Sequence, residues 1–227
     1  MSADSQKQAA GEAAAALVES GMVVGLGTGS TAAWFVKGLA ARKLDVRGVP
    51  TSEQTAVLAR ELGLPLAELD EVKGIDLTVD GADEIGPGLS LIKGGGGALL
   101  REKLVWEASA RCVTIADAAK VVPTLGAFAL PVEVVAFGAK ATQRRLCDVL
   151  ADFEIVGLPK LRQKDGQVFR TDGGNLIYDI PCGRILDPAA LAEAIKSLTG
   201  VVDHGLFLDL ADEALVGTDA GVDVLQP

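Results

Sequence analysis

Short runs of Val, Ile and Leu alternate with longer helical patterns through the first half of the chain. The candidate strands are residues 22–27, 44–50, 75–80 and 112–117. Helical patterns begin at Ser30, Ser52 and Ala98, and both serines are suited to cap the helices that follow them. Such alternation is typical of βαβ units. We therefore predict an α/β fold with a mostly parallel sheet.

The pattern changes after a further candidate strand at residues 130–135. A helical pattern over residues 139–153 precedes short strands bracketed by turn signals, and a second helix is opened by Asp187 and Pro188. This order predicts a small α+β unit with an antiparallel sheet. The strand-like residues 205–226 are expected to return to the first domain. We predict one domain from residues 1–128 with 200–227, and a second from residues 129–199.

Charge and cysteine content argue against several functional classes. A net charge of −10 disfavours a surface that tracks nucleic-acid phosphates, because such surfaces need clustered Lys and Arg. No apolar run approaches the roughly 20 residues that span a bilayer, and the first 20 residues predict an amphipathic helix, not a signal peptide. Cys112, Cys147 and Cys182 are odd in number, widely separated and not in C-x-x-C spacing, which disfavours a disulfide framework or a zinc site. We expect a cytoplasmic protein.

A glycine-rich turn joins the first candidate strand to the helix from Ser30. Gly25, Gly27 and Gly29 permit tight backbone geometry, so main-chain N–H groups and a helix N-terminus can converge on an anion. The dinucleotide fingerprint is absent, because it requires glycine where Ser30 stands. The pattern favours a phosphate cradle, with hydroxyl donors from Thr28, Ser30 and Thr31. A purely structural turn is the alternative.

Residues 76–103 combine acidic side chains, four consecutive glycines and a Lys-Glu pair. Asp80 and Asp83 follow a buried-strand pattern at its carboxyl end, where ligands bind in open α/β sheets. Glycines 94–97 cost about 0.5–1 kcal/mol each relative to alanine in regular structure, so they predict a close approach of backbone to a ligand. Glu102 lies one turn into the following helix and can point back over the glycines. A solvated turn and an exposed helix charge are the alternatives for Asp83 and Glu102.

These residues offer carboxylates, a lysine and a phosphate cradle. They allow no Cys-His pair and no Ser-His-Asp triad, because His204 is the one histidine of the sequence and lies outside every motif. We expect a strand-end or surface role for it. The set suits proton abstraction next to a carbonyl, with a carboxylate as base and a cation or hydrogen-bond donor stabilising the enediolate oxygen.

The motifs GLGTGSTA, DGADE, KGGGGALLREK, IADAAKVV and LPVEVV occur in the order and approximate spacing of type A ribose-5-phosphate isomerases. The chain resembles this family over essentially its full length. The resemblance implies interconversion of D-ribose 5-phosphate and D-ribulose 5-phosphate through a cis-enediolate, in the non-oxidative pentose phosphate pathway, without metal or cofactor. It also implies a Rossmann-like main domain, a smaller ferredoxin-like lid or dimerisation domain, and a homodimer or dimer of dimers.

The resemblance further implies roles for individual residues. Glu102 matches the general base that moves a proton between C2 and C1, and Lys93 matches the lysine that stabilises the developing oxyanion. Asp80 and Asp83 match carboxylates that contact the sugar hydroxyls and assist ring opening. The other substrate-binding residues that it implies are Thr28, Gly29, Ser30, Thr31, Gly81, Ala82, Gly94, Gly95 and Gly96, with Lys120 and Lys7 adding positive charge near the phosphate.

Two other functional classes fit the same architecture. A non-catalytic sugar-phosphate sensor would use the cradle but would not need Glu102. An amino-sugar-phosphate deaminase would need a histidine-based ring opener, which the position of His204 disfavours. A coenzyme A transferase would need a glutamate nucleophile, and trapping of a covalent thioester would identify it.

Overall fold

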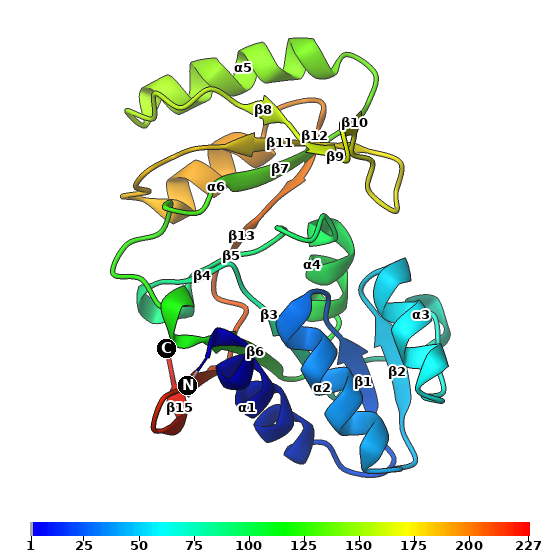
Figure 1. Ribbon diagram of the computed structural model, residues 1–227. Coiled ribbons are helices and arrows are strands. Elements are labelled where there is room, and N and C mark those ends of the chain that lie inside the picture. Colours follow the sequence, from blue (N-terminus) through cyan, green and yellow to red (C-terminus); the bar gives the residue numbers. More distant parts are fainter. Residues whose placement is uncertain (1) are drawn as a thin grey trace. The chain divides into compact units, whose positions relative to one another are not determined.

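The computed structural model describes residues 2–227, which form two compact units (Figure 1). The first unit contains residues 2–82, Arg101–Val121 and residues 209–227, and the second contains Asp83–Leu100 and Val122–Leu208. Residues 83–100 fall in the second unit because β4 (Glu84–Ile85) and β5 (Leu91–Ile92) share a three-stranded sheet with β13 (Leu206–Phe207). The domain bounds predicted from the sequence followed the change of pattern near residue 129 and did not anticipate these pairings.

A six-stranded sheet organises the first unit, with strand order β15-β14-β6-β3-β1-β2. Its strands are β1 (Val23–Leu26), β2 (Arg47–Pro50), β3 (Leu77–Gly81), β6 (Cys112–Asp117), β14 (Glu213–Thr218) and β15 (Gly221–Leu225). Every neighbouring pair is parallel except β14 with β15. The predicted α/β class with a mostly parallel sheet is confirmed. Of residues 205–226, which were expected to return to the first domain, residues 213–225 do so, whereas β13 pairs with β5 in the second unit.

Helices pack on both faces of that sheet. They are α1 (Ala3–Ala16), α2 (Ser30–Ala41), α3 (Glu53–Glu61) and α4 (Leu99–Glu107). Helices α1 and α2 lie side by side in Figure 1 and share a core with Val24 and Leu26 of β1. Val105 of α4 packs in a separate cluster with Val23. Successive residues of a strand point to opposite faces, so α4 covers the face that α1 and α2 leave open. No helix within residues 2–227 combines the length and apolar character that a bilayer crossing requires.

The helix starts confirm two of the three predicted caps. Ser52 accepts a hydrogen bond from the Thr55 N–H at the start of α3, and Asp187 accepts one from Ala190 at the start of α6 (Pro188–Lys196). The prediction for Ser30 is wrong, because Gly29, with φ 115°, occupies the N-cap position and Ser30 is already the first residue of α2. Helix α2 therefore begins without a side-chain cap, because its N-cap residue is Gly29.

The second unit holds a four-stranded sheet with order β12-β7-β11-β8. Its elements, with α6, are β7 (Leu130–Val134), α5 (Ala139–Asp152), β8 (Lys160–Leu161), β11 (Leu176–Ile180), β12 (Val201–His204), and a hairpin of β9 (Gln163–Lys164) and β10 (Gln167–Val168). The pairings within the four-stranded sheet are antiparallel, as predicted. Leu146 of α5 and Leu191 of α6 pack in one core with Val132 and Val134. Glu133, which alternates with those valines, therefore points to the other face of the sheet.

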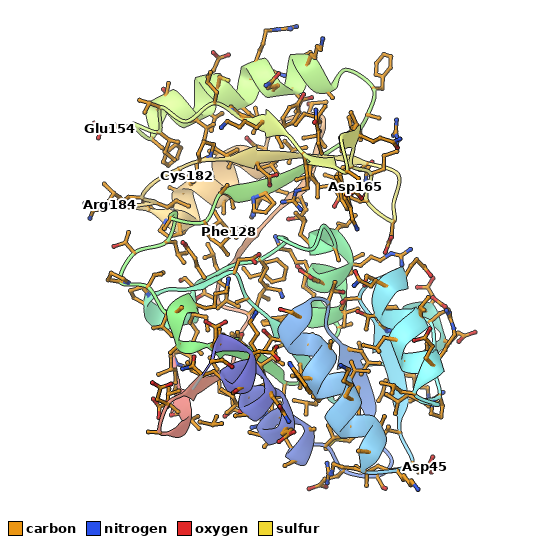
Figure 2. All side chains as sticks on the ribbon, viewed as in Figure 1. Asp45, Phe128, Glu154, Asp165, Cys182 and Arg184 are labelled. Carbon is orange, nitrogen blue, oxygen red and sulfur yellow. The ribbon has the colours of Figure 1, made fainter. Side chains whose placement is uncertain are left out.

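A half-buried thiol also belongs to the second unit. Cys182, labelled in Figure 2, packs at the edge of that unit's core. Burial raises the pKa of its thiol to about 11, so the thiol stays protonated at neutral pH. Cys182 thus behaves as a small apolar residue and offers no nucleophile.

Candidate functional site

Residues 27–31, which comprise the turn after β1 and the first two residues of α2, are called the cradle loop below. Asp80, at the end of β3, anchors it: the side chain is 0% exposed and its Oδ1 accepts hydrogen bonds from the N–H groups of Thr28 (2.9 Å) and Gly81 (2.7 Å). A Cβ at Gly27 would lie 2.5 Å from the Asp80 Cα, so only glycine lets the loop pass this close. Asp80 therefore fixes the backbone of the predicted phosphate cradle.

A cluster of buried hydroxyls supports the same loop. The Thr28 Oγ1 lies 2.7 Å from that of Thr51, 2.8 Å from the Ser52 Oγ and 3.2 Å from the Thr55 Oγ1. Thr55 in turn donates to the Gly27 carbonyl at 2.9 Å. The Thr28 hydroxyl thus points into the first unit, and its contact with substrate stays a prediction. Ser52 also caps α3, as predicted, but no sequence pattern predicts that Thr51, Ser52 and Thr55 surround Thr28.

Positive charge gathers at the start of α2. The Lys7 Nζ, on α1, donates to the exposed Ser30 Oγ at 3.1 Å. Lys120 ends the short helix η3 (Ala118–Lys120), which α1 contacts through a hydrogen bond from the Ala118 N–H to the Gln6 Oε1 (3.4 Å). The structure therefore brings Lys7 to Ser30 and places Lys120 on an element joined to α1, and the role of both lysines at a phosphate stays a prediction. A helix N-terminus with a lysine beside it favours an anion.

Glu102 is buried in the first turn of α4. Its side chain is 3% exposed, so the alternative of an exposed helix charge is wrong. An exposed ion pair between the Arg101 Nη1 and the Glu53 Oε1, at 2.9 Å, ties α4 to α3, and the hydrogen bond from Arg101 lowers the pKa of Glu53. Glutamate is almost never buried unless it is paired or used. The burial of Glu102 therefore marks it as a candidate functional group.

Lys93 follows β5 in the second unit and is 2% exposed. Its N–H donates to the Gly205 carbonyl at 2.8 Å, and its Nζ lies 5.3 Å from the centroid of the Phe207 ring. An ammonium over an aromatic face is stabilised by the ring quadrupole. Phe207 was not predicted, because it lies far along the chain in β13 and no spacing rule relates it to Lys93.

Residues 94–97, called the glycine loop below, fold back on Asp83. The Asp83 Oδ2 accepts from the Gly95 N–H at 2.7 Å, and a Cβ at Gly95 would lie 2.7 Å from the Asp83 Oδ1. The Asp83 N–H donates to the Ile92 carbonyl at 2.8 Å, which fixes the carboxylate to the β5 end of the loop. Asp83 is thus a bound acceptor within the second unit, and the alternative of a plain solvated turn does not describe it.

The predicted site residues divide between the two units. The first unit carries Lys7, Thr28, Gly29, Ser30, Thr31, Asp80, Gly81, Ala82, Glu102 and Lys120, and the second carries Asp83, Lys93, Gly94, Gly95 and Gly96. Within each unit the contacts above bring predicted residues together: Thr28 with Asp80, Lys7 with Ser30, and Asp83 with Gly95.

Comparison with known proteins identifies the family. The family model for ribose 5-phosphate isomerase A (phosphoriboisomerase A) matches residues 47–221. The chain belongs to the ribose 5-phosphate isomerase A family. Membership of this family confirms the predicted resemblance and the prediction that the chain is an isomerase.

Relatives in the ribose 5-phosphate isomerase A family are similar over their full length. The ribose-5-phosphate isomerase A of Caulobacter sp. (strain K31) is 73% identical over 227 residues, with 100% of both chains covered. Among solved structures, ribose 5-phosphate isomerase from Plasmodium falciparum has a TM-score of 0.94 and 38% identity, with 99% of each chain covered. A D-ribose-5-phosphate isomerase in complex with phospho-erythronic acid has a TM-score of 0.93 and 37% identity, with 100% of each chain covered.

Proposed function

We propose that this isomerase interconverts D-ribose 5-phosphate and D-ribulose 5-phosphate, as a step of the non-oxidative pentose phosphate pathway and without metal or cofactor. The observation that carries the proposal is the burial of Glu102, an unusual position for a helix carboxylate that suits a general base. Family membership supports the substrate, and a solved relative is described in complex with a phosphorylated compound, phospho-erythronic acid.

The proposed chemistry moves protons and leaves the carbon chain intact. Glu102 removes the proton from C2 of the open-chain aldose, and the electron pair passes into a cis-enediolate. Glu102 then delivers a proton to C1, while the hydroxyl proton moves from O2 to O1, which leaves the carbonyl at C2. Lys93 stabilises the negative oxygen, as an ammonium in a buried position does more strongly than in water.

Asp80 and Asp83 are proposed to accept hydrogen bonds from sugar hydroxyls and to assist ring opening. Their spacing in the sequence supports a shared role in binding one sugar. Asp80 and Asp83 are three residues apart, and three residues of extended chain span at most about 11 Å. Gly81, Ala82 and the glycine loop complete the proposed contacts with the sugar. Lys7, Ser30, Thr31, Lys120 and the N-terminus of α2 are proposed to hold the phosphate.

We also propose a cytoplasmic homodimer or dimer of dimers. Sedimentation equilibrium of the full chain decides between these assemblies, and a monomer at micromolar concentration would contradict both.

The alternative functions are less well supported. Family membership disfavours the deaminase and the transferase, and His204 is 6% exposed at the end of β12, where its Nδ1 accepts from the Leu206 N–H at 3.3 Å. This confirms a strand-end position, although the expected surface alternative is wrong. A sensor would bind the sugar phosphate equally well without Glu102, so the decisive experiment removes that carboxylate.

Replacing Glu102 by Gln should lower kcat for ribose 5-phosphate by about 10²–10⁴-fold and leave the fold intact, because the amide cannot take the proton. Conversion of aldose to ketose is followed in the presence of EDTA. Glu107→Gln is the matched control, since Glu107 is exposed at the end of the same helix and should be silent. Wild-type turnover in Glu102→Gln would reject the base, and loss of wild-type activity in EDTA would reject the metal-free reaction.

Replacing Thr31 by Ala should weaken binding of ribose 5-phosphate far more than binding of free ribose, because Thr31 lies in the first turn of α2 at the proposed phosphate end. Dissociation constants for both sugars are measured by calorimetry. Equal weakening for the two sugars would reject a phosphate role for this turn.

A further inference from the structure

Arg162 holds the carbonyl groups of the glycine loop. It lies between β8 and β9, and its side chain is 13% exposed. The Nη1 group donates to the Gly94 carbonyl at 2.8 Å and to the Gly95 carbonyl at 3.2 Å. Nothing in the sequence pattern predicts these contacts, since Arg162 lies 68 residues after Gly94 and 67 residues after Gly95.

Asp179 on β11 fixes the guanidinium in place. The Arg162 Nε donates to the Asp179 Oδ2 at 2.9 Å, and its Nη2 donates to the Oδ1 of the same carboxylate. Such a two-point pair holds the plane of the guanidinium as well as its position. Because β11 is paired on both sides, with β7 and β8, the guanidinium is mounted on a rigid sheet.

Phe169, which follows β10 and pairs with Arg162 across the hairpin, lies against the other end of the glycine loop. The Arg162 carbonyl accepts from the Phe169 N–H at 3.0 Å, across the hairpin whose tip is marked by Asp165 in Figure 2. A Cβ at Gly97, where φ is +84°, would lie 2.5 Å from the Phe169 Cε1. Arg162 and Phe169 therefore fix opposite ends of the glycine loop.

One peptide group links Arg162 to Asp83. The carbonyl of Gly94 accepts from Arg162, and the N–H of the same peptide, on Gly95, donates to the Asp83 carboxylate at 2.7 Å. A cation on the carbonyl polarises the peptide and strengthens its N–H as a donor. The guanidinium thus acts on Asp83 through a peptide, and on Lys93 through the residue that directly follows it.

We propose that Arg162 is a positioning residue for the isomerisation, which orients Asp83 and Lys93 by holding the glycine loop. This inference rests on the proposed function for its catalytic consequence. Its structural part, the restraint of the loop, is independent of which substrate is used.

The test compares three variants with a matched control. Arg162→Met, which keeps the stem and removes every donor, should lower kcat about 10–100-fold, because a small misplacement of reacting groups has effects of this size. KM should change less than about threefold, since the phosphate is assigned to groups of the first unit. Arg162→Lys should recover part of kcat, and Asp179→Asn should lose less than Arg162→Met. Arg170→Met is the control, because Arg170 is exposed and donates to the Gly174 carbonyl.

Hydrogen exchange of residues 94–100 supplies a readout that needs no activity. Exchange in Arg162→Met should be about tenfold faster than in wild type, and unchanged in Arg170→Met. A wild-type chain inactive on ribose 5-phosphate would reject the proposed function, while exchange would still test the loop restraint. Unchanged exchange, or faster exchange with kcat within about twofold of wild type, overturns the positioning role. If Arg162→Met fails to fold, Arg162→Lys and Asp179→Asn are judged by the same two readouts.

Discussion

The cradle loop and the glycine loop are both glycine-rich, and different groups hold the backbone of each in place. Each is rich in glycine, each follows a strand, and each leads into a helix, α2 or α4. Neutral hydroxyls around Thr28 support the cradle loop, together with the carboxylate of Asp80. The glycine loop is held by charged groups on both sides, Arg162 at its carbonyls and Asp83 at an N–H.

The difference follows from what each loop is proposed to face. Neutral hydroxyls can fix a backbone without adding charge beside Lys7, so they leave the phosphate end positive. The glycine loop must orient carboxylate and ammonium groups, and hydrogen bonds to charged partners are roughly twice as strong as neutral ones. The two loops thus differ in that neutral hydroxyls supplement one carboxylate at the cradle loop, whereas charged groups on both sides hold the glycine loop.

The largest effect on stability should come from substituting one glycine of each loop. Gly97→Ala places a methyl group against the Phe169 ring at positive φ, whereas Gly29→Ala, also at positive φ, meets nothing within 4 Å. We expect a loss of about 3 kcal/mol for Gly97→Ala and about 1 kcal/mol for Gly29→Ala, because only the first adds overpacking to backbone strain. Urea unfolding curves measure the free energy of unfolding of both variants. Equal losses would show that Phe169 does not pack against Gly97.

A smaller loss is expected for Thr28→Val, which removes the central hydroxyl of the cradle cluster. Its partners lose a buried hydrogen bond, at a cost of about 1–3 kcal/mol. The loss should be equal at low salt and in 1 M NaCl, since neutral groups are not screened. Thr199→Val, at an exposed position, is the control. A loss that shrinks with salt would contradict the neutral character of this support.

The smallest effect should be a pH dependence in the second unit. Glu133 on β7 is 1% exposed, and its Oε1 accepts from Thr171 (2.8 Å) and Asn175 (2.9 Å). Within residues 2–227 its Oε2 has no hydrogen-bond partner. Burial raises the pKa of Glu133 above its ordinary value of 4.5, and the carboxylates of Asp203 and Asp172 raise it further.

Because the folded chain binds this proton more tightly than the unfolded chain, Glu133 stabilises the fold below pH 4.5, and that contribution is lost as pH rises through the raised pKa. Glu133→Gln cannot titrate, so the Tm of wild type should fall relative to that variant by on the order of 1–2 °C between pH 4.5 and neutral pH. Thermal scans across this range measure the difference. Parallel curves for the two proteins would show that folding does not raise the pKa of Glu133.

Much of the fold was predictable because it depends on local patterns. The alternation of apolar runs and helical periods gave β1, β3 and β6 within two residues, and Ser52 and Asp187 cap their helices as expected. The prediction for β2 began at residue 44, but β2 starts at Arg47, because Lys43 adopts φ 52° and a turn delays the strand. The grouping of residues 83–100 was missed because their pairing partner, β13, lies more than 100 residues later.

The α/β order and the glycine-rich turns with charged residues beside them follow from local sequence, since propensity and spacing act over a few residues. The tertiary structure decided which groups hold those turns: Asp80 beneath Thr28, the hydroxyls of residues 51–55 beside it, and Arg162 on the carbonyl of Gly94. These partners lie 23 to 68 residues apart in the chain, and their meeting depends on strand order and helix packing. Spacing rules carry no information at that range.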